Sequence, residues 1–403
     1  MALPGLLLFS LALVLVGVVS AQHPLNTPNP SIKYPTQPPR QNPFIKPPGA
    51  GYGIQTQRPY NIAHRGANNV YPEESEQAYK LAIDLGADFI ESDIQATKDG
   101  VLVCFHDIGL NLTTDVSTRP EFASKLTTYN DITGGDGTNT DWFLVDFTYD
   151  ELKTLKLKQR FPYRDQSFNG QFSIITFERY IQIAQEANRV VGIYPEIKSP
   201  RFNKAHVQFP GGKSFEQAVV DLLNQYGYGG PYLTDRWLAK PLFIQCFAYT
   251  SLLEAKKYTD SPLVFLYDSL DARTQDTNET YASLSTDAAF DMLKSIGVVG
   301  LGPYKANIQP INTTTNYYSG KPNDFVTRAH NKGFEVHPYT YRADTPQLVF
   351  DLHGNFFNEF IYFDKVIGVD GFFTDFTESA FQYLEWTHPI FTKSDIYQTL
   401  IFQ

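Results

Sequence analysis

Cysteine is scarce in this chain, whose 403 residues include only Cys104 and Cys246. Two thiols are too few for a disulfide framework, so the sequence must specify its fold without one. The length and a hydrophobic content of 42% suffice for one large domain or for two domains of average size.

Net positive charge is missing as well. The chain carries 33 Lys and Arg against 43 Asp and Glu, which gives a net charge of −10. Nonspecific nucleic-acid binding requires a basic surface, so we expect no nucleic-acid partner. A small anionic substrate stays compatible with this composition, because a metal ion and a few local cations can invert the field inside a pocket.

Long apolar runs are absent after the first 21 residues. Residues 1–21 form an apolar run that ends in Val19-Ser20-Ala21, small side chains of the kind that a signal peptidase recognises. The run is short for a membrane span, which favours a cleaved signal peptide over an uncleaved anchor. We therefore expect a secreted protein with no membrane span in the mature chain. Sequons for N-glycosylation, which agree with a secretory route, begin at Asn111, Asn278 and Asn312.

Proline is concentrated in residues 22–59, together with Asn and Gln. Proline lacks the N–H group that regular secondary structure needs, and it favours an extended chain. We predict an exposed linker or tail here, acting as a spacer, with a motif for an unknown partner as the alternative. The folded domain is then expected over residues 60–403.

From residue 60 onward, short β-rich runs alternate with helical patterns. The eight runs are 61–65, 88–94, 191–197, 242–247, 263–267, 298–304, 335–340 and 370–376, and the helical segments include 74–85, 177–188, 215–225, 287–296 and 324–332. Repeated strand–helix–strand units indicate a parallel sheet. Eight strands predict an α/β fold closed into a (β/α)8 TIM barrel, with a doubly wound open sheet as the alternative.

A ninth β-like run, 101–107, follows the second one closely, across the short turn Thr97-Lys98-Asp99-Gly100. Parallel neighbours need a longer crossover, so these two runs are predicted to form an antiparallel hairpin. A two-residue Asp-Gly loop would pair Lys98 with Val101 and, further along, Asp93 with His106. The hairpin would carry His106 back to the barrel mouth and would leave the barrel at eight strands.

The stretch 109–172, between this hairpin and the next helix, is long for a strand-to-helix connection. It contains a turn-rich loop at 133–140 and a short helical pattern around 149–156. Long loops at the catalytic face of a barrel usually carry function. We expect a small insertion subdomain beside the mouth.

Charged and imidazole side chains gather where the proposed elements end. They are His64, Arg65, Glu91, Asp93, His106, Glu196 and Lys198. Strand alternation places Glu91 and Asp93 on one face, and likewise Glu196 and Lys198. Singly, each has an ordinary structural explanation, since a histidine at a strand end is most often a hydrogen-bonded structural residue. Their expected convergence at the carboxyl ends of the strands, where barrel active sites lie, favours a common site.

Three converging carboxylates are costly in a buried site unless a cation neutralises them. Oxygen ligands from Glu91, Asp93 and Glu196 suit Ca²⁺ or Mg²⁺, and an extracellular setting favours Ca²⁺. The guanidinium of Arg65 and the ammonium of Lys198 suit phosphate oxygens. Two histidines beside a bound phosphate can share the roles of general acid and base.

Further candidates for substrate binding stand at other strand ends. They are Gln245, Phe247, Tyr304 and His337, followed by Tyr339 and Phe376, and packing is an equally good explanation for each. Alternation points Gln245 and Phe247 to one side of their strand and Cys246 to the other. Cys104 shares a strand face with His106. We therefore predict that Cys104 and Cys246 form no disulfide.

The run IAHRGANNVYPEESEQAYKLAIDLGADFIESDIQATKDGVLVCFHD at 62–107 resembles the signature of the glycerophosphodiester phosphodiesterases. Later motifs, such as GIYPEIKSP, YGYGG, GLGPY and GFFTDF, resemble the secreted or periplasmic branch of that family, and the likeness extends from about residue 60 to about residue 385.

The resemblance implies a TIM barrel with an insertion, a Ca²⁺-type site at Glu91, Asp93 and Glu196, catalysis by His64 and His106, and phosphate binding by Arg65 and Lys198. It implies that the substrate is a small glycerophosphodiester such as glycerophosphocholine, cleaved to glycerol 3-phosphate and an alcohol. Glu74 departs from the pattern, because the family often has Asn there. The extra carboxylate leaves the number of bound metal ions open.

Other functions compete with this one. A phospholipase D-like transferase on a related barrel would also use two histidines and a metal, but it would act on acylated lipids. A glycosidase could use Glu91 and Asp93 as its carboxylate pair, but it would have no need of His64, His106 and Lys198. A secreted binding protein with an inactive barrel is disfavoured, because every expected catalytic residue is present.

Overall fold

The computed structural model describes residues 52–132 and 139–389. The predicted signal peptide, most of the Pro-rich tail and most of the turn-rich loop at 133–140 lie outside these residues, so those assignments stay predictions.

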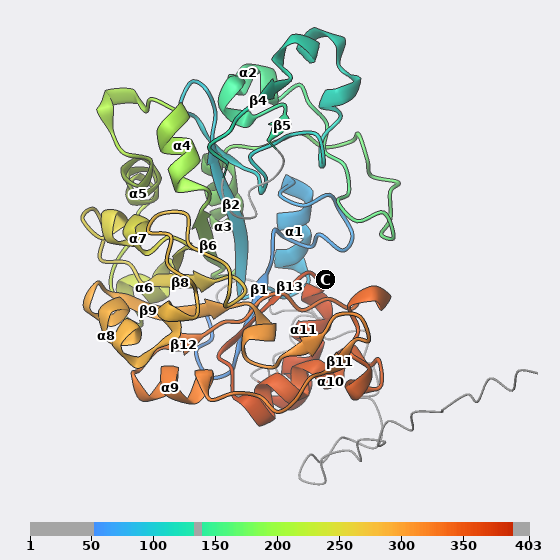
Figure 1. The fold of residues 1–403 in the computed structure, drawn as a ribbon, viewed down its shortest axis with the longest axis vertical. Coiled ribbons are helices and arrows are strands. Elements are labelled where there is room, and N and C mark those ends of the chain that lie inside the picture. The colour runs from blue at the N-terminus through green and yellow to red at the C-terminus, as the bar shows by residue number, and fades with distance from the viewer. Residues whose placement is uncertain (1–51, 133–138, 390–403) are drawn as a thin grey trace, which may run out of the picture. The chain divides into compact units, whose positions relative to one another are not determined.

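Eight parallel strands form the central sheet (Figure 1). In chain order they are β1 (Tyr60–Ala63), β2 (Phe89–Ala96), β6 (Gly192–Ile197), β7 (Ile244–Cys246), β8 (Leu263–Tyr267), β9 (Val298–Pro303), β12 (Glu335–Val336) and β13 (Gly371–Thr374). From β1 to β12 each strand pairs with the next, and β13 pairs with β1. Asp370 N donates to Val336 O at 2.9 Å and Tyr341 N donates to Phe373 O at 2.8 Å, so the chain around β12 also joins β13. The predicted (β/α)8 barrel is confirmed, and the open sheet is wrong.

Helices lie outside the strands (Figure 1). They are α1 (Glu76–Asp84), α2 (Tyr149–Leu152), α3 (Phe177–Glu186), α4 (Pro200–His206), α5 (Phe215–Gln225), α6 (Asp235–Ala239), α7 (Tyr249–Ala255), α8 (Asp287–Ser295), α9 (Phe325–Asn331), α10 (Phe356–Ile361) and α11 (Thr377–Thr387). Five of them match predicted helical segments, and their starts have a local cause. Ser75, Thr176, Ser214 and Thr286 cap α1, α3, α5 and α8, because each hydroxyl accepts a backbone N–H three residues later.

The hairpin forms with a register one residue away from the predicted one. Strand β3 (Leu102–Cys104) runs antiparallel to β2, with Ala96 opposite Leu102 and Ile94 opposite Cys104. The loop has three residues rather than two, and it closes with Gly100 at φ 77°, a conformation that favours glycine. Asp93 therefore lies opposite Phe105, whose N–H donates to the Asp93 carbonyl at 2.8 Å. His106 comes next and still reaches the mouth.

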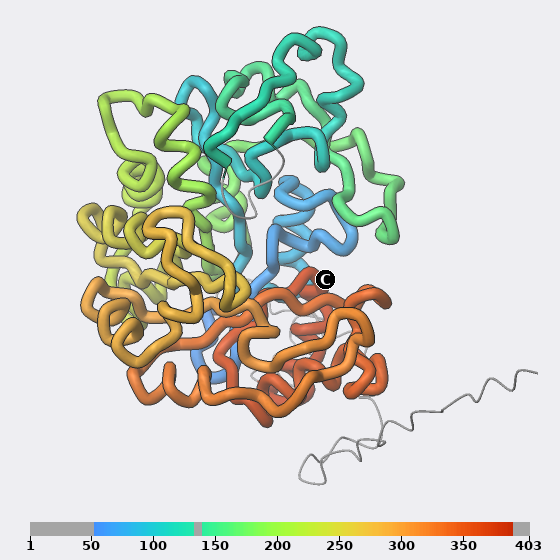
Figure 2. Tube along the Cα trace, in the orientation of Figure 1, coloured from blue at the N-terminus to red at the C-terminus, as the bar shows by residue number. Residues whose placement is uncertain are grey.

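The expected insertion is a packed unit with its own hydrophobic cluster. Phe122, Phe147, Leu152 and Leu157 pack there against Val103 and Phe105 of the hairpin. Figure 2 shows this part of the chain as the cyan-to-green lobe, and Figure 1 places α2, β4 (Thr127–Thr128) and β5 (Thr140–Asp141) together within it. A second small hairpin, β10 (Ile311–Asn312) with β11 (Tyr317–Tyr318), follows β9.

Both cysteines of the chain lie among the described residues, where both are buried free thiols. The predicted absence of a Cys104–Cys246 disulfide is confirmed. Among the helices that the structure describes, none is long and apolar enough to cross a bilayer.

Gly192 of β6 provides a test of barrel packing. A methyl group at this position would overlap the ring of Phe89, which is fully buried on the neighbouring strand β2. We expect Gly192→Ala to destabilise the protein by about 1–3 kcal/mol, because the packed ring has no free space to move into. Urea unfolding measures the change. Gly53→Ala, where no atom lies within 4 Å of the new methyl group, is the control and should unfold like the wild type.

Candidate active site

The carboxyl ends of the barrel strands surround a cavity of about 180 Å³. Its walls come from most of the strands and from the hairpin. The lining residues are His64, Arg65, Glu91, His106, Glu196, Lys198, Gln245, Phe247, Leu266, Tyr304, Tyr339, Thr340, Arg342 and Phe373. The sequence candidates thus converge on the catalytic end of the barrel, as strand alternation predicted.

The three predicted metal ligands form one buried cluster. Glu91, Asp93 and Glu196 each offer a carboxylate oxygen, and these oxygens lie within 4.8 Å of one another. The pairing of β2 with β6 sets Asp93 directly beside Glu196. Glu91 faces the same way because it stands two residues before Asp93 on β2.

Burial makes this cluster electrostatically costly. It raises the pKa of Glu91 well above its usual value and the pKa of Glu196 to about 8, with the Asp93 charge adding to both effects. Burial acts in the same direction on Asp93, but Lys198, His106 and Arg65 hold the pKa of Asp93 well below its usual value. A divalent cation would stabilise all three ionised carboxylates.

One contact in the cluster is poorly satisfied by protein groups alone. Arg65 Nε lies 2.9 Å from Asp93 Oδ2, yet neither of these buried atoms makes a hydrogen bond of acceptable geometry. A set of oxygen donors that includes the unsatisfied Asp93 Oδ2 fits a hard cation such as Ca²⁺ or Mg²⁺. The described residues can therefore hold one divalent ion at Glu91, Asp93 and Glu196.

The two cationic candidates lie against this cluster. Lys198 Nζ is 3.1 Å from Glu196 Oε1 and 3.4 Å from Asp93 Oδ1. The backbone N–H of Arg65 donates to Glu91, and its guanidinium contacts Glu73 at 3.2 Å. Both side chains line the cavity as well, so positive charge is available to an anion bound there.

Each histidine at the mouth is held by a carboxylate. His64 Nδ1 lies 2.7 Å from Asp375 Oδ1, and His106 Nδ1 lies 2.6 Å from Asp107 Oδ1. When Nδ1 carries the proton toward its carboxylate, Nε2 keeps the lone pair that a base needs. Burial, followed by the charge of Arg65, lowers the pKa of each imidazole to about 4. Both rings are therefore neutral at pH 7 in the free protein.

His337 is placed away from this cavity. It is fully buried, and its Nδ1 lies 2.9 Å from the Tyr194 hydroxyl. Its ring packs against the rings of Tyr60 and Phe243 inside the barrel. Its expected contact with substrate is not supported. Gln245, Phe247, Tyr304 and Tyr339 do line the cavity, whereas Phe376 packs against Phe356.

Glu74, the departure from the family pattern, lies outside the triad of metal ligands. Its backbone adopts φ 62°, the left-handed conformation in which Asn is common. Its carboxylate accepts hydrogen bonds from Tyr79, from Ser92 at 2.8 Å and from the backbone N–H of Asp93 at 3.1 Å. Glu74 thus supports the strand that carries the ligands.

Four residues at the site were missed from the sequence: Asp375, Arg342, Arg160 and Arg164. Asp375 directly follows β13, the last strand, so its position alone was a signal that an acidic group would stand at the mouth. Arg342 Nε donates to Asp375 at 2.7 Å and lines the cavity. Arg160 and Arg164 belong to the insertion, and no local pattern shows that they reach the barrel.

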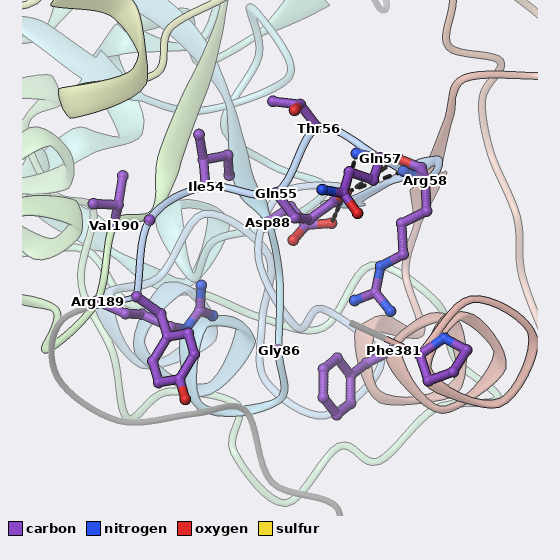
Figure 3. Close-up of a pocket in the computed structure, with 13 residues that line it drawn as sticks. Ile54, Gln55, Thr56, Gln57, Arg58, Gly86, Asp88, Arg189, Val190 and Phe381 are labelled. Atoms are coloured by element: carbon purple, nitrogen blue, oxygen red, sulfur yellow. Dashed lines mark hydrogen bonds between the residues drawn. The ribbon is translucent and has the colours of Figure 1, made fainter. Parts of the chain in front are cut away.

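A second cavity, of about 370 Å³, lies at the amino ends of β1, β2 and β6 (Figure 3). Residues 52–58, near the end of the predicted tail, form one wall of it. Gln55 donates to Asp88 at 2.9 Å, and Arg58 pairs with Glu385 at 2.5 Å. The described end of the tail is therefore packed on the barrel. This end of a barrel supports stability, and reactions occur at the other.

Comparisons with known proteins agree with the geometry. The model of the Glycerophosphoryl diester phosphodiesterase family matches residues 64–379. The chain is 50% identical over 338 residues to the glycerophosphodiester phosphodiesterase GDPD6 of Arabidopsis thaliana, which covers 84% of this chain and 89% of the relative. It is 28% identical over 363 residues to a glycerophosphodiester phosphodiesterase of Haemophilus influenzae, with 80% and 89% covered.

Solved structures share the fold. One is a putative glycerophosphoryl diester phosphodiesterase from Silicibacter pomeroyi, with a TM-score of 0.53 at 17% identity, covering 84% of this chain and 96% of that one. Another is an Oleispira antarctica phosphodiesterase in complex with the product sn-glycerol-3-phosphate, with a TM-score of 0.51 at 19% identity, covering 81% and 97%. At these identities the likeness concerns the barrel architecture.

Proposed function

This chain belongs to the glycerophosphoryl diester phosphodiesterase family, and from that premise we propose that it hydrolyses glycerophosphodiesters such as glycerophosphocholine to sn-glycerol 3-phosphate and an alcohol. The family makes it a phosphoric diester hydrolase. The proposal adds a substrate, a dependence on a divalent metal ion and catalysis by His64 and His106. The observation that carries it is the meeting of two carboxylate-held imidazoles and a buried acidic triad on one cavity.

Binding would begin with the phosphodiester anion. Arg65 and Lys198 line the cavity and offer a planar fork and a point charge to its oxygens. When bound at Glu91, Asp93 and Glu196, a divalent ion, Ca²⁺ by preference, supplies Lewis-acid stabilisation of the developing negative charge. Gln245, Phe247 and Tyr304 stand on the same walls and would contact the glycerol or the headgroup.

Proton transfer would then be shared by the two imidazoles. We assign the base to His64, which takes the proton of the nucleophile at Nε2, and the acid to His106, which protonates the leaving alcohol. The bound diester favours the protonated form of His106, because its negative charge opposes the effect of burial and of Arg65 on that pKa. The nucleophile is either the glycerol 2-hydroxyl, which gives a cyclic phosphate, or water.

The test of this function is release of glycerol 3-phosphate from glycerophosphocholine. We expect release with Ca²⁺ and its loss in EDTA, restored by added Ca²⁺ and compared with Mg²⁺. A diester that lacks the glycerol 2-hydroxyl distinguishes the two nucleophiles, since only direct attack by water would cleave it. Release in EDTA at the full rate would contradict the metal requirement. Cleavage of acylated lipids but not of glycerophosphocholine would contradict the proposed substrate.

Export is a second part of the proposal. The sequon asparagines Asn111, Asn278 and Asn312 are all exposed, so glycosyltransferases can reach them in the folded protein. We expect the secreted protein to begin after residue 21 and to shift in gel mobility on treatment with an endoglycosidase. Sequencing of the amino terminus of protein from the medium tests the cleavage.

A further inference from the structure

One turn of the insertion, residues 159–164, reaches behind both histidines. Arg160 Nη2 lies 2.8 Å from Asp107 Oδ2, and Arg164 Nη2 lies 2.7 Å from Asp375 Oδ2. These are the aspartates whose other oxygens hold His106 and His64. Two arginines only four residues apart in the sequence thus complete two separate Arg–Asp–His chains.

Both arginines are tightly held. The side chain of Arg164 is 3% exposed, pairs with Asp344 at 2.5 Å and also hydrogen-bonds to Asn68, whose amide donates to Asp375 at 3.0 Å. Arg160, at 14% exposure, donates to both oxygens of Glu73. Because Glu73 also contacts Arg65, the same turn supports a residue of the phosphate-binding wall.

Such contacts restrict the aspartates. Asp375 Oδ2 accepts from Arg164 and Arg342, and Oδ1 faces His64 and Asn68, so neither oxygen can rotate away from the imidazole. A fixed carboxylate fixes the ring orientation and the tautomer of its histidine. The supporting groups of a catalytic residue therefore determine how often that residue is correctly aimed.

We propose that Arg160 and Arg164 are positioning residues that orient His106 and His64 through Asp107 and Asp375, so that the insertion completes the catalytic apparatus of the barrel. This inference rests on the proposed function. The competing explanation is that the two arginines only fasten the insertion to the barrel, in which case their loss would lower stability and leave the chemistry of the folded fraction intact.

The experiment compares Arg160→Ala and Arg164→Ala with Arg119→Ala, a control in the same insertion whose arginine pairs with Asp115 and Glu121 on the surface. Kinetics are recorded for the full chain with glycerophosphocholine and with glycerophospho-4-nitrophenol, and thermal unfolding measures the folded fraction. We expect each inner variant to lose about 10- to 100-fold in kcat. In Arg164→Ala, KM should change less than threefold, whereas Arg160→Ala can also raise KM because Arg160 supports Arg65 through Glu73. The control should keep wild-type kcat.

The choice of leaving group distinguishes the effects of the two Arg–Asp–His chains. Nitrophenolate departs without protonation, so misplacement of the acid should matter little for that substrate. With His106 as the acid, the loss in Arg160→Ala should shrink to within a few fold on the nitrophenyl diester, whereas the loss in Arg164→Ala should persist. Millimolar guanidinium should restore part of the activity of both variants, and NaCl at equal ionic strength should not.

A fall in kcat no larger than the fall in folded fraction, equal for both substrates and without rescue, would overturn the inference. Should Arg164→Ala fail to fold, Arg164→Lys keeps the charge but loses the fork, and a wild-type kcat in that variant would count against a positioning role for Arg164. If the wild-type protein is inactive on both diesters, the proposed function itself is wrong, and this result is independent of the arginine variants.

Discussion

Replacing His106 or His64 by alanine is expected to lower kcat on glycerophosphocholine by about 10²- to 10⁴-fold. Each imidazole lies on the cavity wall with Nδ1 held by an aspartate, and no other histidine lines this cavity in the described part of the chain. Removing a ring deletes proton transfer at Nε2 and leaves binding by Arg65 and Lys198 in place. The loss should therefore fall on kcat rather than on KM.

Two further histidines provide matched controls. His330 is exposed on α9, pairs with the half-buried Asp370 and is absent from the cavity wall, so His330→Gln should keep wild-type kcat. His337 is fully buried in the barrel, so His337→Phe should change the unfolding temperature more than kcat per folded molecule. An active His64→Ala or His106→Ala enzyme, within tenfold of wild type, would show that the affected imidazole carries no proton.

The barrel strands could be predicted because each has a local signature. Continuous β-rich runs such as 263–267 became strands, since a strand buried on both faces must be apolar throughout. Helix starts were less certain, and the predicted start of α1 at residue 74 was two residues early. Ser75 caps that helix, and Glu74 has a left-handed backbone that no helix contains.

The hairpin register and the placement of His337 were predicted wrongly, because the local sequence at each position is compatible with two geometries. Lys98-Asp99-Gly100 permits a two-residue or a three-residue hairpin loop, and the latter changes every cross-strand partner by one. His337 and Tyr339 stand two residues apart on one face, about 7 Å along the strand. Sequence alternation assigns both to the barrel interior, but it does not say which one is at the mouth.

The residues that hold the histidines could not be predicted from sequence spacing. His64 meets Asp375 across 311 positions, and Arg164 meets Asp375 across 211. Closure of the barrel by β13 and the docking of the insertion create these contacts. They depend on long-range packing, to which neither periodicity nor a short motif gives access.

The acidic triad leads to the other large effect. Glu196→Gln and Asp93→Asn are expected to weaken Ca²⁺ binding on the order of 100-fold, because Ca²⁺ affinity depends on the number of charged oxygen ligands. Calorimetric titration measures the affinity directly. At a Ca²⁺ concentration that is 100 times the wild-type Kd, bound metal stabilises the wild type by about 2.7 kcal/mol, and the variants should show little of this gain.

The stabilities of the metal-free wild type and the metal-free variant are expected to show the reverse order, which makes this comparison the more diagnostic one. Burial raises the pKa values of Glu91 and Glu196, which means that their charges are unfavourable in the folded state without a cation. In EDTA, Glu196→Gln should therefore be at least as stable as the wild type, although it has lost metal binding and activity. Glu378→Gln, at an exposed position on α11, should match the wild type in both conditions. A carboxylate whose role is to bind a cation does not stabilise the fold until the cation binds. If metal-free Glu196→Gln is clearly less stable than the metal-free wild type, Glu196 stabilises the fold through its ion pair with Lys198.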